Sequence, residues 1–221
     1  MMLPDAAPTR VTGSPPDTAT ATKALLLLSP TGAGIHAVVH RIAELDLAPV
    51  KPCVRDSTRP LQPWDDETLR SFPKGTAAEP EFHERLRRSE YLAVMEDGYL
   101  YGIRKTDVIK TLRCGHIPVL RGLPGHTDPL KSYFATTHPE VGLVTVFMTT
   151  NPADAWKEVV RKRGFEVDNR IAASDKILRD LGLTDGVPTE AALKRRGIDR
   201  LVVNHWGNID QTAQAIANLL R

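Results

Sequence analysis

ALLLLSPTGAG, residues 24–34, is a short apolar run that ends in a glycine-rich turn. A continuous run of leucines before turn residues is typical of a strand that is buried on both faces. The apolar residues that follow at helical spacing are Val38, Val39, Ile42 and Leu45. They predict a helix directly after the turn. A buried strand, a glycine turn and a helix open a βαβ unit, so this order predicts an α/β fold.

The rest of the chain continues this alternation around an irregular middle. Residues 56–80 contain four prolines and are predicted to be mostly loop. Further strands are predicted at residues 119–120, 143–148 and 201–203, and helices at residues 82–92, 106–113, 154–162, 169–181 and 208–220. Phe82, Leu86 and Tyr91 are expected to face inward from the first of these helices. Alternating strands and helices imply a parallel sheet that is covered on both faces, with the irregular middle as an insertion.

Composition narrows the possible partners. The 221 residues hold 29 Lys and Arg against 27 Asp and Glu, a net charge of +2. This balance gives no electrostatic case for a nucleic acid or a membrane surface as the partner. Cys53 and Cys114 are isolated, without the spacing of a zinc site or a disulfide framework, which favours a reduced, cytoplasmic location.

The termini and the hydropathy pattern indicate neither a membrane span nor a signal peptide. The longest apolar run, residues 24–28, is five residues long, whereas a spanning helix needs about 20. Pro4, Asp5 and Pro8 stand where a signal peptide carries its basic and apolar regions. Residues 1–22 are rich in Pro, Thr, Ala and Ser, and we expect them to form a disordered tail.

The turn after the first strand resembles a phosphate-binding loop. In the motif G-x-x-x-x-G-K-[ST], backbone N–H groups surround phosphate oxygens, the lysine neutralises phosphate charge, and the hydroxyl holds Mg²⁺. Here Ile35 stands in the lysine position and His36 in the hydroxyl position. Two interpretations remain open: a phosphate site formed by Gly32, Ala33, Gly34 and His36, or a tight strand-to-helix connection.

Several segments, in order along residues 23–221, carry a resemblance to a known family. They are Leu26–Gly34, Ser57-Thr58-Arg59-Pro60, Glu81-Phe82 to Tyr91-Leu92, Gly98-Tyr99-Leu100-Tyr101-Gly102, Arg161-Lys162-Arg163-Gly164 and Val203-Asn204. The chain resembles guanylate kinases and ribose 1,5-bisphosphate phosphokinases. The resemblance implies a P-loop fold of the nucleoside-monophosphate-kinase type over residues 23–221. It also implies an acceptor-binding insertion at about residues 55–105 and a helical lid at about residues 155–180.

The same resemblance assigns roles to particular residues. It implies that Arg59 and Tyr101 bind the phosphate of the acceptor, an arrangement suited to a phosphomonoester. It further implies that Arg161, Arg163 and Arg170 act from the lid. The alternative is that Arg59 forms a surface salt bridge and Tyr101 packs in the core. Trp64 has the same ambiguity between stacking on a ligand and core packing.

The sequence departs from the family first at the acceptor site and then where ATP and Mg²⁺ would bind. Ala93 stands near the position of the guanine-reading Glu, and Gln62 replaces a second loop arginine. The segment Leu120-Arg121-Gly122-Leu123-Pro124 lacks the acid that helps to hold Mg²⁺, and Ser174 stands near the position of a second lid arginine. ATP and Mg²⁺ are the cofactors that the resemblance implies, but these changes argue against both.

Two functions follow. One is a protein that binds a small phosphorylated molecule, a nucleotide or sugar phosphate ester, and has lost MgATP phosphotransfer. It would be either a pseudokinase that acts as a binding or interaction module with a protein partner, or an enzyme turned to other chemistry. The other is an active ATP-dependent kinase of a nucleoside monophosphate or ribose phosphate with a rebuilt P-loop. His36, His40 and Glu44 share one helix face and would suit either a metal or solvent. We assign no metal and no catalytic residue.

Overall fold

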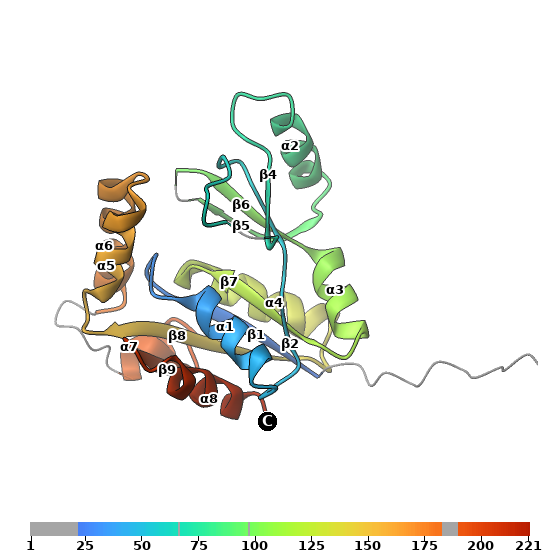
Figure 1. Ribbon diagram of the computed structural model, residues 1–221. Coiled ribbons are helices and arrows are strands. Elements are labelled where there is room, and N and C mark those ends of the chain that lie inside the picture. The colour runs from blue at the N-terminus through green and yellow to red at the C-terminus, as the bar shows by residue number, and fades with distance from the viewer. Residues whose placement is uncertain (1–21, 66, 97, 183–189) are drawn as a thin grey trace, which may run out of the picture.

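The computed structural model describes residues 22–65, 67–96, 98–182 and 190–221 (Figure 1). The predicted tail lies outside these ranges except for Thr22, whose carbonyl accepts a hydrogen bond from the Gly142 amide at 2.8 Å. The helices are α1 Ile35–Glu44, α2 Glu79–Arg87, α3 Lys105–Arg113, η1 Pro124–His126, α4 Thr127–Thr137, α5 Ala155–Arg163, α6 Val167–Asp180, α7 Glu190–Arg195 and α8 Ile209–Leu219. None of these described helices is long and apolar enough to span a bilayer.

The larger sheet is parallel throughout and has its first strand in the middle. Its order is β2-β7-β1-β8-β9. The strands are β1 Lys23–Leu28, β2 Val50–Pro52, β7 Ile117–Gly122, β8 Gly142–Asn151 and β9 Arg200–His205. All of residues 24–28 are fully buried. The predicted α/β fold, with a parallel sheet covered by helices, is confirmed.

The two faces of this sheet form two cores. Leu25 and Leu27 of β1 pack on one face with the apolar residues of α1 and α8. Leu26 and Leu28 pack on the other face with those of α3 and α4. Successive strand residues point to opposite faces, so a run of four leucines supplies both cores at once.

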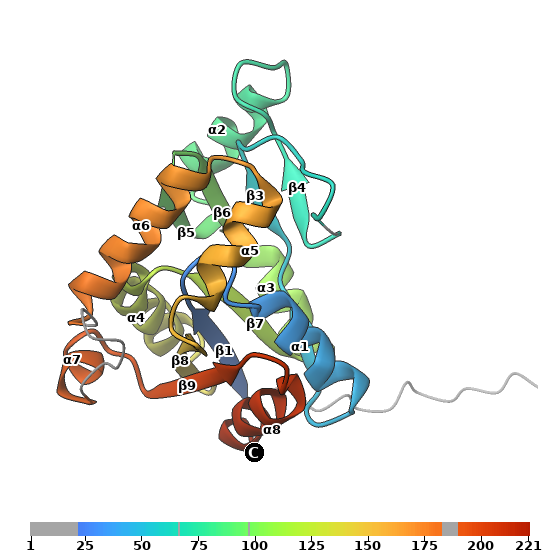
Figure 2. The same cartoon turned by 60° about the vertical axis from the view of Figure 1, so that its left-hand side comes forward.

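A smaller sheet lies above the larger one in Figure 1, together with α2. Its order is β4-β3-β6-β5, with bounds β3 Arg55–Ser57, β4 Leu69–Ser71, β5 Tyr91–Glu96 and β6 Leu100–Arg104. Figure 2 shows α5 and α6 rising from the larger sheet beside this smaller one. The cavity described below is lined from all three parts.

The smaller sheet overturns part of the sequence-based assignment. The helix predicted over residues 82–92 begins at Glu79 and ends at Arg87, and Tyr91 opens a strand instead. Ser89 has a φ of +55°, a conformation that no helix continues through. Phe82 is fully buried as expected, but Leu86 is 37% exposed. The segment predicted as loop also contains the short strands β3 and β4.

Asp56 of β3 is the centre of a buried ionic network in the smaller sheet. Its side chain is fully buried. It accepts hydrogen bonds from the Tyr91 hydroxyl at 2.9 Å and from Nε and Nη2 of Arg104 at 2.6 and 2.9 Å. Burial, together with the Asp56 charge, raises the pKa of Tyr91. The network joins β3 to β5 and β6.

We expect the two cysteines to differ sharply in reactivity. Cys53 is buried, and this burial, with the Asp107 carboxylate nearby, raises the pKa of its thiol to about 12. Cys114 is exposed. Because the thiolate is the reactive form, a thiol reagent at mildly alkaline pH should label one cysteine per native chain and both after unfolding. Cys114→Ser should abolish native labelling; fast labelling of that variant would contradict the prediction.

Candidate functional site

The glycine loop, residues 29–34, connects β1 to α1. Gly32 and Gly34 both have a φ of +90°, which residues with a Cβ rarely adopt. A Cβ on Gly32 would also lie 2.7 Å from the backbone carbonyl oxygen of Trp156 in α5. The glycines therefore shape the turn and allow α5 to approach it closely.

Buried polar side chains hold the glycine loop in place. Nδ2 of Asn204 donates to the Ala33 carbonyl at 2.9 Å, while its Oδ1 accepts from the Thr212 hydroxyl at 3.0 Å. On the other side, the hydroxyl of Ser174 in α6 accepts from the Thr31 amide at 3.1 Å. Gly34, the N-cap of α1, leaves the first-turn amides without a side-chain cap. Such amides are suited to an anion.

A cavity of about 350 Å³ lies beside the glycine loop. Cavities of roughly 300–1,000 Å³ are typical of small-molecule sites. Its lining comes from the glycine loop, both sheets, α5, α6 and the segment after β9. The charged and aromatic lining residues are Arg55, Arg59, Arg121, Arg163, Arg170, His36, Asp65, Trp64, Tyr101 and Trp206.

Aromatic rings position two of these arginines. The guanidinium of Arg55 lies 5.5 Å from the centre of the Tyr101 ring, and that of Arg163 lies 5.6 Å from the Trp64 ring. Tyr101 is buried and also contacts the small apolar cluster of the smaller sheet. Burial and the neighbouring charge of Arg170 lower the pKa of Arg163. The cavity therefore gathers like charges closely enough for them to affect one another.

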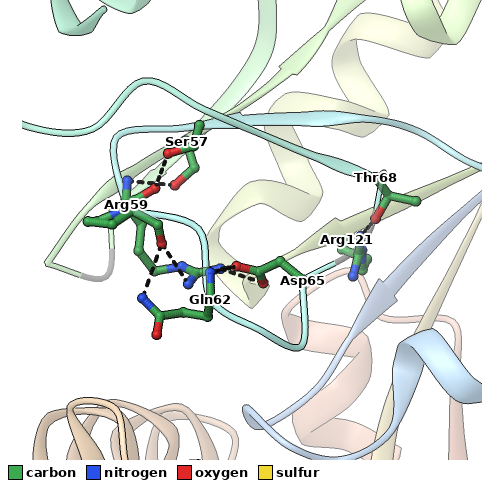
Figure 3. A network of polar contacts seen from close by, with 8 residues as sticks. Ser57, Arg59, Gln62, Asp65, Thr68 and Arg121 are labelled. Carbon is green, nitrogen blue, oxygen red and sulfur yellow. Dashed lines mark hydrogen bonds and ion pairs between the residues drawn. The ribbon is translucent and has the colours of Figure 1, made fainter. Parts of the chain in front are cut away.

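Arg59 is tied to its own loop (Figure 3). Its side chain is 5% exposed, and Nη2 donates to both carboxylate oxygens of Asp65 at 2.7 and 2.8 Å. The backbone amide of Gln62 donates to the same carboxylate at 2.6 Å. The buried Nε of Arg59 has no hydrogen-bond partner among the described residues. The guanidiniums of Arg59 and Arg170 lie 5.8 and 5.4 Å from the centre of the Phe165 ring.

Direct contacts join the smaller sheet to the α5–α6 pair. The hydroxyl of Tyr99 donates to Oε1 of Glu166 at 3.0 Å, and this hydrogen bond raises the pKa of Tyr99. Glu166 has a φ of +47°, and it immediately precedes α6. With the Thr31–Ser174 contact, α6 therefore touches both the smaller sheet and the glycine loop.

The structure brings together most of the residues singled out in the sequence. Those that line the cavity are Gly32, Ala33, Gly34, His36, Arg59, Tyr101, Arg163 and Arg170. Arg161 is exposed and does not line it. Trp64 is partly buried and carries Arg163 on its ring. The roles of these residues remain predictions.

Sequence reasoning missed Arg55, Thr68 and the location of Arg121 on the cavity. Nη2 of Arg121 donates to the Thr68 hydroxyl, and the Arg55 amide donates to the Thr68 carbonyl at 2.9 Å. That the segment around Arg121 contains no acid was visible in the sequence. The contact of Arg121 across the two sheets was not, because the three residues are far apart along the chain.

The donor set does not fit Mg²⁺. Magnesium prefers oxygen ligands, carboxylates above all. Of the described residues that line the cavity, only Asp65 carries a carboxylate. This carboxylate already accepts hydrogen bonds from the Arg59 guanidinium and from the backbone amide of Gln62. Within the described ranges, no group of three or more His, Cys, Asp or Glu is arranged to hold a metal.

Comparisons with known proteins identify the fold. No protein-family model matches the sequence, and no curated protein matches it. A guanylate kinase from Anaplasma phagocytophilum superposes with a TM-score of 0.57 at 18% identity, covering 91% of this chain and 86% of that one. An uncharacterized protein from Eubacterium ventriosum ATCC 27560 superposes with a TM-score of 0.40 at 12% identity, covering 90% of this chain and 98% of that one. The protein APE1195 superposes with a TM-score of 0.40 at 12% identity, covering 91% of this chain and 96% of that one. The chain thus has a fold similar to that of guanylate kinase.

Proposed function

We propose that this chain binds a nucleotide or sugar phosphate ester in the cavity beside the glycine loop and does not transfer phosphate from MgATP. One observation carries the proposal: five arginines from both sheets, α5 and α6 line a cavity whose described lining holds one carboxylate. Arginine is suited to phosphate because its planar fork donates two parallel hydrogen bonds to phosphate oxygens. The glycine loop and the first turn of α1 add backbone amides.

The charges that phosphoryl transfer requires are replaced on the nucleotide side. Ile35 and His36, at the start of α1, line the cavity where a lysine would meet the β- and γ-phosphates and a hydroxyl would hold Mg²⁺. One preorganised donor to the transition state contributes roughly 10² to 10³ in rate. Since this chemistry depends almost wholly on positioning and electrostatics, losing several such groups removes most of the catalysis.

Calorimetry with matched ligands tests the proposal. Ribose 5-phosphate or guanosine monophosphate should bind, while ribose and guanosine should bind much more weakly. Arg59→Ala should weaken phosphate-ester binding by about 1.5–3 kcal/mol through the loss of a charge-assisted contact. Arg200→Ala, an exposed arginine at the amino end of β9, is the matched control and should leave the affinity unchanged. Equal affinity for phosphorylated and unphosphorylated compounds would contradict the proposal.

A second variant separates ligand contact from loop support. Arg59 holds Asp65, so its removal also disturbs residues 57–65. Asp65→Ala breaks the same ion pair but keeps the guanidinium. If Arg59 contacts the phosphate, Asp65→Ala should retain the affinity or increase it, because a competing carboxylate is gone. If Arg59 only supports the loop, both variants should lose affinity equally.

A further inference from the structure

Arg121 lies where the two sheets meet the glycine loop. It is the fifth residue of β7 and pairs in register with Leu27 of β1, the strand that leads into the loop. Its guanidinium donates to the hydroxyl of Thr68, just before β4 (Figure 3). This hydrogen bond fixes the cation at the cavity wall, at the carboxyl end of the parallel sheet.

Arg55 lies on the other side of the same threonine. Its amide donates to the Thr68 carbonyl at 2.9 Å, and its guanidinium stacks on Tyr101. Arg55 and Arg121 both line the cavity. Arg55 contacts Thr68 through its backbone amide and Arg121 contacts it through its guanidinium, and we call these two residues the Thr68 pair.

A second group of cations comes from the loop after β3, from α5 and from α6. Arg59 and Arg170 flank Phe165, and Arg163 stacks on Trp64. We call these three residues the Phe165 group. Burial, and after it the charge of Arg170, lowers the pKa of Arg163. Such crowding of like charges costs free energy in the empty cavity, and an anion that enters it relieves this cost.

The two groups together exceed what one phosphate can engage. A single phosphate monoester presents three terminal oxygens, whereas five guanidiniums line the cavity, two of which also donate to Asp65 and Thr68. The cavity of about 350 Å³ also has room for a longer anion. We propose that the cavity takes a ligand with at least two phosphate groups, one on the Thr68 pair and one on the Phe165 group, in its metal-free form. This inference rests on the proposed function and specifies its ligand class.

Magnesium should weaken this binding. A bound Mg²⁺ removes two negative charges from a polyphosphate and occupies the oxygens that the guanidiniums need. It also seeks carboxylate or water ligands, and Asp65, the one carboxylate of the described lining, is held by Arg59. Because Arg121 stands at the end of β7, a cation there repels the metal. The expected effect of magnesium is therefore the reverse of that in a kinase.

Calorimetry of the full chain with inorganic tripolyphosphate and inorganic phosphate tests the inference. In EDTA, tripolyphosphate should bind at least about tenfold more tightly than phosphate, as one further charge-assisted contact would give. An excess of MgCl₂ over the ligand should weaken tripolyphosphate binding by about tenfold or more. Tighter binding with magnesium, or equal affinity for the two anions, would overturn the inference.

Variants of the Thr68 pair assign the second phosphate. Arg121→Gln should weaken tripolyphosphate binding about tenfold or more and change phosphate binding less. Arg121→Lys keeps the charge and should retain most of the affinity, which guards against a mere folding defect. Arg200→Gln is the control. Unchanged tripolyphosphate affinity in Arg121→Gln overturns this inference, yet it leaves the proposed function standing if Arg59→Ala still weakens monoester binding. If the wild-type protein binds neither tripolyphosphate nor the phosphate monoester, both this inference and the proposed function are wrong.

Discussion

Asp56→Ala should cost about 3–5 kcal/mol of the free energy of unfolding, the loss typical when one partner of a buried ion pair is removed. Asp56 is fully buried, and Arg104 donates to both of its carboxylate oxygens. Its removal leaves the Arg104 charge and the Tyr91 hydroxyl without their acceptor. Denaturant titration of the purified variant measures the loss.

The isosteric variant Asp56→Asn controls for volume. It keeps an acceptor oxygen for Tyr91 but removes the charge that balances Arg104, so it should lose less than Asp56→Ala. Tyr91→Phe removes one hydrogen bond and should cost about 0.5–1.5 kcal/mol. A loss below about 1 kcal/mol for Asp56→Ala, well short of the buried-pair value, would show that the network contributes little to the smaller sheet.

Ile35→Lys combined with His36→Ser should increase the affinity for MgATP by about 2–4 kcal/mol, from two charge-assisted contacts. In the wild type MgATP should bind weakly, because a partly buried isoleucine desolvates phosphate charge without pairing it. Gly32, Gly34 and Asn204 are untouched, so the loop should keep its shape. Phosphotransfer should stay low, since Arg121 still stands at the end of β7. Calorimetry measures the affinity, and a coupled assay measures turnover.

Three outcomes of this double variant differ in meaning. A higher affinity for MgATP would show that the nucleotide side has lost its charged groups but keeps the backbone conformation of a phosphate-binding loop. Loss of the best phosphate ester without a gain for MgATP shows that His36 and Ile35 serve another ligand. Unchanged affinity for every phosphate compound defeats both readings and reduces the glycine loop to a connection. The single variant His36→Ser separates the two positions.

The main sheet could be predicted because its signals are local. Its longer strands are apolar runs, and α1, α3, α5, α6 and α8 show helical spacing. Helix α4 was not predicted, although its Leu130 and Phe134 are buried in the core of one face. The last helix is an example of a local signal: Asn208 is a residue type that caps helices, and its side chain accepts from the Gln211 backbone amide at 3.4 Å. The smaller sheet could not be predicted, since β3 and β4 have three residues each and pair with segments distant in sequence.

The candidate site shows the same division. Gly32, Gly34, Arg59 and Tyr101 were found through the order of short motifs along the chain. Arg55 and Arg121 both contact Thr68, which links a short strand pair to the main sheet. No residue spacing in the sequence predicts that these arginines contact the same threonine. The exposed position of Arg161, beside Arg163 on the same helix, was likewise a matter of helix orientation rather than composition.

The central position of β1 has a consequence for biosynthesis. The chain is made from its N-terminus, so four leucines leave the ribosome before β7 and β8, the strands on either side, exist. The glycine loop can be fixed only later in synthesis, because Asn204 donates to its Ala33 carbonyl and Thr212 in turn donates to Asn204. Nascent chains halted before residue 204 should therefore expose the leucine run and depend on chaperones. The loop that follows β1 is thus translated before the other described strands and is among the last to reach its final conformation.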